Sequence, residues 1–104
     1  AGRDFARGYC LFNDVALAVS ELRRSGEAWR ALVVDCDVHQ GDGTAQILGP
    51  DPDAFTLSLH GARNYPFQRI PSDLDVDLPA ASLHYDFGRP DNGEDARAAH
   101  LLDV

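Results

Sequence analysis

The stretch ALVVDCDVHQGDG, residues 31–43, decides the fold of this chain of 104 residues. Its first four residues are all apolar, and a short continuous apolar run predicts a strand that is buried on both faces, as in a parallel sheet. Asp35, Asp37 and His39 then stand at every second position, and alternate side chains of extended backbone point to the same side. We therefore expect a strand that ends in a cluster of cation-binding side chains.

The residues around this stretch complete an α/β pattern. Upstream, Asn13 is a good N-cap for a helix over residues 13–25, where apolar residues recur at helical spacing. Downstream, the pattern predicts a short helix over 44–48, a second strand over 55–59 and an edge strand over 72–78. This alternation is typical of an α/β protein with parallel strands, whose functional sites lie beyond the carboxyl ends of the strands.

Composition excludes several classes of protein. The hydrophobic share of 44% and the charged share of 25% are those of a globular domain, and the net charge of -8 argues against binding to nucleic acid. No apolar run approaches the roughly 18 to 20 residues that span a bilayer. Cys10 and Cys36 form no CxxC pair and are expected to be packed, reduced side chains. With a polar, charged amino-terminal segment, these features predict a cytoplasmic protein.

The nine residues from Asp35 to Gly43 predict a chemistry as well. A neutral imidazole with carboxylates and no thiolate suits zinc in a catalytic setting, where three protein ligands leave one position for water. Gly41 and Gly43 allow a sharp turn, and Asp42 between them is placed to orient a histidine. An Asp at a strand end before Gly-Asp-Gly is often only a turn with side-chain hydrogen bonds. The nine residues together, however, have little purely structural use.

The order Asp-x-Asp-x-His-x-Gly-Asp-Gly resembles the metal-binding signature of the histone deacetylases and their bacterial relatives, which include the acetylpolyamine amidohydrolases. The stretch GYCLFNDVA, residues 8–16, looks like the motif that precedes it in the same family. Further stretches continue the likeness: SLH at 58–60, NYP at 64–66 and SDLDV at 72–76. Gln40, where better-known members have a second His, is more similar to bacterial and class IV-like members. The resemblance covers about residues 6–78 and leaves 79–104 unplaced.

The resemblance implies an arginase/deacetylase fold, with three layers around a parallel sheet, of which residues 1–104 would be a central fragment. By the same resemblance, Asp37 and His39 are two of three zinc ligands. Asp35 is similar to a residue that holds a structural potassium, together with Ser58, Leu59 and the backbone of Asp37 and His39.

Asp35 and Asp42 also resemble the carboxylates that orient the two histidines of a catalytic pair. The family would place that pair directly before Ala1, and its third zinc ligand and oxyanion-stabilising Tyr far downstream. Tyr9 and Tyr65 resemble the aromatic walls of a channel for acyl-lysine. These expectations are carried by the resemblance alone.

The implied activity is zinc-dependent hydrolysis of an N-acetyl or other acyl amide, such as acetyl-lysine or an acetylated polyamine, by the parent protein. The fragment itself is expected to be inactive. One alternative is a truncated, non-catalytic module of the same fold that binds metal or a partner. Another is a cation-binding α/β domain unrelated to deacetylases, against which the motif before the first helix argues.

For the polar residues near the later predicted strands, we expect a structural role rather than a chemical one. His60 follows the second predicted strand, and we expect it to make hydrogen bonds within the fold rather than to bind metal. Asp73, Asp75 and Asp77 alternate with apolar residues, which predicts the solvated face of an edge strand.

Overall fold

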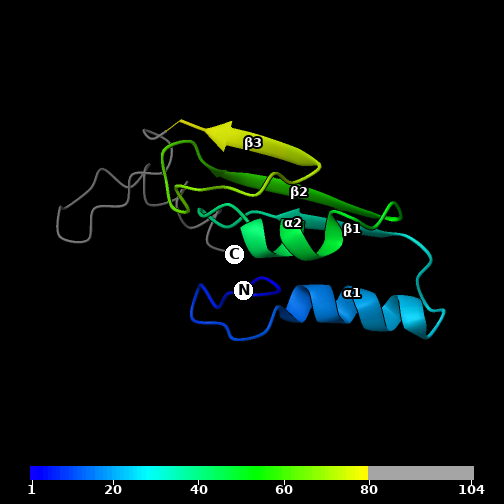
Figure 1. Ribbon diagram of the computed structural model, residues 1–104. Coiled ribbons are helices and arrows are strands. Elements are labelled where there is room, and N and C mark those ends of the chain that lie inside the picture. The colour runs from blue at the N-terminus through cyan, green and yellow to red at the C-terminus, as the bar shows by residue number, and fades with distance from the viewer. Residues whose placement is uncertain (80–104) are drawn as a thin grey trace, which may run out of the picture.

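The computed structural model describes residues 1–79. Its elements are α1 (Asp14–Arg24), β1 (Ala31–Asp35), α2 (Asp42–Leu48), β2 (Ala54–Gly61) and β3 (Leu74–Leu78). The three strands form a parallel sheet in the order β1-β2-β3, and both helices lie on one side of it (Figure 1). The predicted α/β class is confirmed. The described residues form two layers, one of helices and one of strands. No helix of residues 1–79 is long and apolar enough to cross a membrane.

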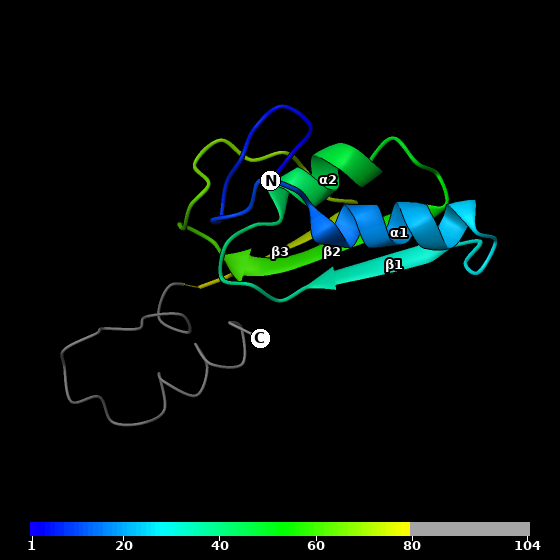
Figure 2. The ribbon, with the colours of Figure 1, turned by 90° about the horizontal axis from the view of Figure 1, so that it is seen from below.

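The helix α1 forms where the sequence predicts it. Asn13 is its N-cap, and the Asn13 Oδ1 accepts a hydrogen bond of 2.9 Å from the amide of Ala16. The Asn13 side-chain amide donates to the carbonyl of Ala1 at 2.9 Å and to the Thr44 hydroxyl at 3.0 Å. This one side chain therefore starts α1 and also ties the amino-terminal segment to the start of α2, beside which that segment lies (Figure 2).

Replacing Asn13 by alanine is expected to lower the free energy of unfolding by about 0.5 to 2 kcal/mol, the range measured for lost N-caps. Asn13→Ser is the matched control, because a serine hydroxyl still caps the helix but cannot make both of the other contacts. Urea denaturation of the full-length protein measures the difference. If Asn13→Ala is as stable as the unchanged protein, the capping role assigned here is wrong.

The second helix and the second strand are longer than predicted. α2 begins at Asp42, with Gly41 as its N-cap and the Gly41 carbonyl accepting from the Ala45 amide at 3.0 Å. β2 runs from Ala54 to Gly61 because it pairs with β1 on one side and with β3 on the other. The Gly-Asp-Gly segment therefore lies at the start of a helix rather than in an isolated turn.

The two faces of the sheet differ in how well they are covered. On the helix side, the core consists of Ala16, Leu48 and Ala54, with Val33 packed against them. The opposite face is apolar but open: the most exposed of its side chains are Leu32 (66%), Val34 (54%), Phe55 (46%) and Leu74 (45%). The prediction that β1 is buried on both faces is wrong for the described residues. The apolar pattern suits a sheet with two covered faces, and residues 1–79 cover only one.

The acidic residues Asp73, Asp75 and Asp77, before and within β3, also make contacts inside the fold. Asp73 accepts hydrogen bonds from the Thr56 amide at 2.8 Å and from the Thr56 hydroxyl at 2.9 Å. Asp75 and Asp77 lie opposite Ser58 and His60 of β2 in the strand register. Both remain exposed, as predicted, but the Asp77 Oδ1 lies 3.0 Å from the His60 Nε2, and Asp75 accepts hydrogen bonds from Gln40 and Ser72.

Candidate metal centre

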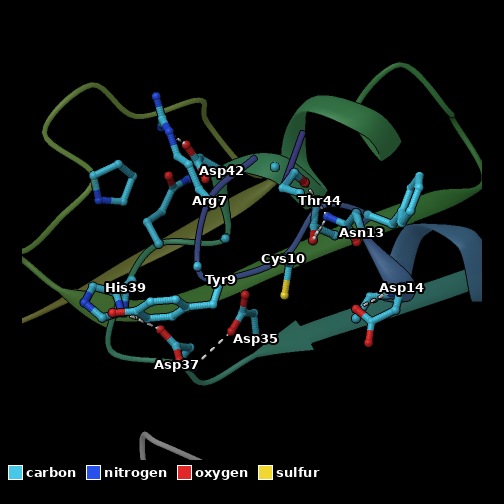
Figure 3. A pocket seen from close by; sticks show the side chains of 18 of the residues that line it. Arg7, Tyr9, Cys10, Asn13, Asp14, Asp35, Asp37, His39, Asp42 and Thr44 are labelled. Atoms are coloured by element: carbon cyan, nitrogen blue, oxygen red, sulfur yellow. Dashed lines mark hydrogen bonds and ion pairs between the residues drawn. The ribbon is translucent and has the colours of Figure 1, made fainter. Parts of the chain in front are cut away.

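A cavity of about 650 Å³ lies at the carboxyl ends of β1 and β2, beside the start of α2. Figure 3 shows Asp37 and His39 on one side of it, Asp35 close to the end of β1, and Arg7 with Asp42 on the other side. These five side chains line the cavity. The position agrees with the rule that open α/β sheets place their sites beyond the carboxyl ends of the strands.

Asp37 and His39 lie together at a bend of the chain, whereas the alternation predicted extended backbone that would also bring Asp35 to them. The Asp37 Oδ1 lies 3.0 Å from the His39 Nδ1 and accepts a hydrogen bond of 2.7 Å from the His39 amide. Both side chains are about half exposed, at 51% and 52%, and both line the cavity. Because zinc binds such oxygen and nitrogen atoms at about 2.0 to 2.2 Å, atoms this close together can share one ion.

The candidate metal-binding side chains that lie together are two rather than three. Among residues 1–79, no group of three His, Cys, Asp or Glu side chains is close enough to hold a metal ion. Asp35 does not form a group of three with Asp37 and His39. Its Oδ1 instead accepts a hydrogen bond of 2.9 Å from the amide of Asp37. The donor set therefore fits zinc as two of the usual three ligands. The hydrogen bonds of an Asx turn, which the alternative interpretation predicted, are present in the same loop.

Asp35 is partly buried at the end of β1. Burial raises the pKa of the Asp35 carboxyl above its usual range, and the hydrogen bond from Asp37 opposes that shift. A Cβ atom at Gly41 would collide with the Asp35 carboxylate, and one at Gly43 would collide with the carbonyl of Ala1. The two glycines are therefore required for space. The chain turns sharply at Gly41, as expected: φ is -74° and ψ is 54°, and the Asp42 amide donates to the Gln40 carbonyl at 2.8 Å.

Ser58 and His60 lie on β2, below the cavity. Ser58 is the register partner of Asp35 in the sheet, and its hydroxyl accepts a hydrogen bond of 3.3 Å from the amide of Gly41. The Ser58 Oγ also lies 2.9 Å from the Nδ1 of His60, which is completely buried. The structural role predicted for His60 agrees with this contact. A carboxylate and a hydroxyl on neighbouring strands are oxygen donors of the kind that hard cations prefer.

The other end of His60 faces an ion pair. Its Nε2 lies 3.0 Å from the Oδ1 of Asp77, which also binds Arg69 at 2.6 Å. The hydrogen bond from Arg69 lowers the pKa of the Asp77 carboxyl. Leu59 follows Ser58 on β2, and neither of the two lines the cavity.

Asp42 is buried and binds Arg7. The Arg7 Nη1 donates to the Asp42 Oδ2 at 2.6 Å, and the guanidinium lies 4.4 Å from the centre of the Phe5 ring. Sequence reasoning missed Arg7. The residue stands directly before the GYCLFNDVA stretch, but no local pattern indicates that it would reach a carboxylate 35 positions away.

Tyr9 occupies a tight turn. The Arg7 carbonyl accepts from the Cys10 amide at 3.2 Å, and both central residues have left-handed backbone angles, with φ of 62° at Gly8 and 59° at Tyr9. A positive φ is unusual for a side chain as large as tyrosine, and such strain often accompanies functional positions. The turn holds Tyr9 fully exposed at the cavity. It also exposes Cys10, so the prediction of a packed cysteine is wrong there.

Tyr65 lines the same cavity from the loop between β2 and β3. Its ring lies edge-on to the ring of His39, with 6.1 Å between the centroids. Tyr9 and Tyr65 therefore line the same cavity as Asp37 and His39, and their role as walls of a substrate channel stays a prediction.

Comparison with known proteins identifies relatives of this site and fold. The family model described as "Histone deacetylase domain" matches residues 1–90. An uncharacterised protein of Picosynechococcus is 49% identical over 75 residues, which is 72% of this chain and 25% of that protein. A probable deacetylase of Methanothermobacter thermautotrophicus is 42% identical over 57 residues, 55% of this chain and 17% of that protein.

The fold is shared with solved structures. A crystal structure of an HDAC homologue from Aquifex aeolicus matches with a TM-score of 0.63 and 27% sequence identity, over 76% of this chain and 24% of that chain. The chain thus spans about a quarter of the length of the first of these relatives and of the solved structure.

Proposed function

Since the chain belongs to the histone deacetylase family, we propose that the protein it is part of hydrolyses an N-acetyl or other acyl amide with the help of zinc. The observation that carries this proposal is the pair formed by the Asp37 Oδ1 and the His39 Nδ1, 3.0 Å apart and open to a cavity. Acetyl-lysine in a protein or an acetylated polyamine is the proposed class of substrate.

Asp37 and His39 would hold the zinc ion. When bound, zinc lowers the pKa of its water and polarises a carbonyl oxygen, the chemistry that amide hydrolysis requires. Asp35 and Ser58, with the backbone of Leu59, would hold a structural potassium. The Asp37 amide donates to Asp35, and the Gly41 amide donates to Ser58. These hydrogen bonds keep the two oxygen atoms next to residues 36–41, the proposed metal-binding loop between β1 and α2.

Asp42 would orient the general base. The backbone of Ala1 runs along the cavity, where the absence of a side chain at Gly43 leaves room for its carbonyl. A histidine pair directly before Ala1 would therefore enter the cavity on the side of Asp42. Arg7, held against Asp42, fixes that carboxylate in place and keeps its charge compensated.

The walls of the cavity suit an apolar acyl group with a charged or polar remainder outside. Tyr9 and Tyr65 provide aromatic surfaces in the cavity that Asp37 and His39 also line. The full chain carries a net charge of -8, which favours encounter with a basic amine such as a lysine-rich tail or a polyamine. Acetate release by the full-length protein from acetyl-lysine peptides and acetylated polyamines, with and without a zinc chelator, tests the proposal.

Asp42→Asn is expected to lower kcat about 10- to 100-fold while zinc stays bound, because an outer carboxylate orients a residue without touching the metal. Zinc content and single-turnover rates of the full-length variant measure the two effects separately. Arg7→Gln is the matched control, since it removes the ion pair but leaves the Asp42 carboxylate, and its loss of rate should be smaller. An unchanged chemical step in Asp42→Asn would rule out the orienting role.

A further inference from the structure

We propose that Gln40 is a positioning residue that sets the place of Tyr65 at the cavity by holding the loop of residues 62–73 against the metal-binding loop. This inference rests on the proposed function in one respect, the role of Tyr65 as a wall for the substrate. The contacts of Gln40 themselves are independent of it. No catalytic step is assigned to Gln40.

Gln40 is buried although it follows directly after the half-exposed His39. Its exposed fraction is 3%, whereas the His39 side chain is 52% exposed. The chain bends at residues 37–39, and although both His39 and Gln40 line the cavity, the amide of Gln40 is held against residues 70–75. The same short segment can therefore hold a ligand atom on one side and a neighbouring loop on the other.

The Gln40 amide bridges two segments that are far away in the sequence. Its Nε2 donates to the carbonyl of Ile70 at 2.6 Å and to the Oδ1 of Asp75 at 3.2 Å, and it lies 3.5 Å from the Ser72 hydroxyl. The Asp75 carboxylate in turn accepts from the Ser72 amide at 3.0 Å. An amide nitrogen has two hydrogens to give, and here it meets one carbonyl and one carboxylate.

The first part of the loop is closed by a second side chain. Arg69 donates to the carbonyls of Gly61 and Ala62, at 2.8 Å and 3.0 Å, and to Asp77 at 2.6 Å. Residues 62–69 thus form an arch whose two ends are joined by Arg69. Gln40 then fixes the next residue, Ile70, to the segment that carries His39.

The contacts of Gln40 and Arg69 together set the distance between Tyr65 and His39 across the cavity. Tyr65 stands on the arch, and its ring lies 6.1 Å from the ring of His39. Because His39 and Gln40 are adjacent, any change at the Gln40 contacts moves the arch relative to the proposed ligand. Removing the buried Gln40 amide would remove its hydrogen bonds to the Ile70 carbonyl and the Asp75 carboxylate, so the arch is expected to loosen.

The test compares the full-length protein with Gln40→Leu, which removes the donor, and Gln40→His, which restores an N–H donor. Gln46→Leu is the matched control, because Gln46 also joins distant segments, through Arg3 and Asp4, but does not line the cavity. If Gln40→Leu does not fold, Gln40→Glu, which has the same shape and lacks the amide donor, takes its place.

Two readouts are expected to move together. In Gln40→Leu, hydrogen exchange of the amides of residues 63–72 should rise about tenfold or more, with residues 31–35 and 54–60 unchanged. The KM for an acetyl-lysine peptide should rise by about tenfold while kcat stays within about twofold and the zinc content is unchanged. Gln40→His should recover both effects, and Gln46→Leu should show neither.

Three results would overturn the inference: unchanged exchange of residues 63–72, faster exchange without a change in KM, or a loss of zinc that accounts for the loss of activity. If the unchanged protein hydrolyses no acyl amide, the proposed function fails instead. The exchange measurement still decides whether Gln40 holds the loop, so the two failures are distinguishable.

Discussion

Replacing His39 by alanine in the full-length protein is expected to abolish zinc-supported deacetylation, with a loss well beyond the roughly 10- to 100-fold typical of a residue outside the ligand set. The physical reason is that His39 Nδ1 and Asp37 Oδ1, 3.0 Å apart, are the two groups that fit one ion. Without either, both the affinity for zinc and the geometry that activates water are lost. Asp37→Ala is expected to behave in the same way.

The measurement combines zinc content with acetate release from an acetyl-lysine peptide. Asp14→Asn is a suitable control, because Asp14 lines the same cavity, lies in the first turn of α1 and is not near the proposed ligand pair. Near-normal turnover with full zinc occupancy in His39→Ala or Asp37→Ala would show that the ligand assignment is wrong. Loss of turnover in Asp14→Asn as well would indicate a general effect on the cavity instead.

Residues 1–104 expressed alone are expected to be weakly protected against hydrogen exchange and inactive toward acetyl-lysine peptides with added zinc. The reason is the open face of the sheet, where Leu32, Val34 and Phe55 are 66%, 54% and 46% exposed. Burying a side chain of this size stabilises a fold by about 1.5 to 3 kcal/mol, so several such contributions are missing at once. Activity is not expected because no three possible metal-binding side chains lie together in residues 1–79, and the proposed pair is one short of the usual three zinc ligands.

A double substitution separates this explanation from general instability. Leu32→Thr with Val34→Thr keeps β-forming residues but removes apolar surface. In the isolated chain it should reduce binding of a hydrophobic dye, and in the full-length protein it should lower the free energy of unfolding. Slow exchange across residues 31–61 of the isolated chain would contradict the folding prediction. Zinc-dependent turnover that disappears in His39→Ala would contradict the prediction of inactivity.

Much of the fold could be predicted from the sequence because its signals are local. Asn13 caps α1 through an amide three residues away, and the apolar run of β1 identifies a strand of a parallel sheet. Asp37 and His39 also come together through a local contact, the hydrogen bond from the His39 amide to the Asp37 carboxylate, although at a bend and not on the extended backbone that the alternation predicted. Family membership follows from the order of these motifs along the chain.

Tertiary structure alone decided which partners the buried polar groups take. Asp42 binds Arg7 across 35 positions, and Gln40 reaches Ile70 across 30. No local pattern specifies either contact, because each depends on where two separate segments arrive once the sheet has formed. The same holds for the covered face of β1. Its apolar residues are suited to burial on both sides, but only the packing of α1 and α2 determines which side residues 1–79 bury. Local sequence sets backbone conformation within a few residues, whereas contacts between distant segments are set by the packing of whole elements.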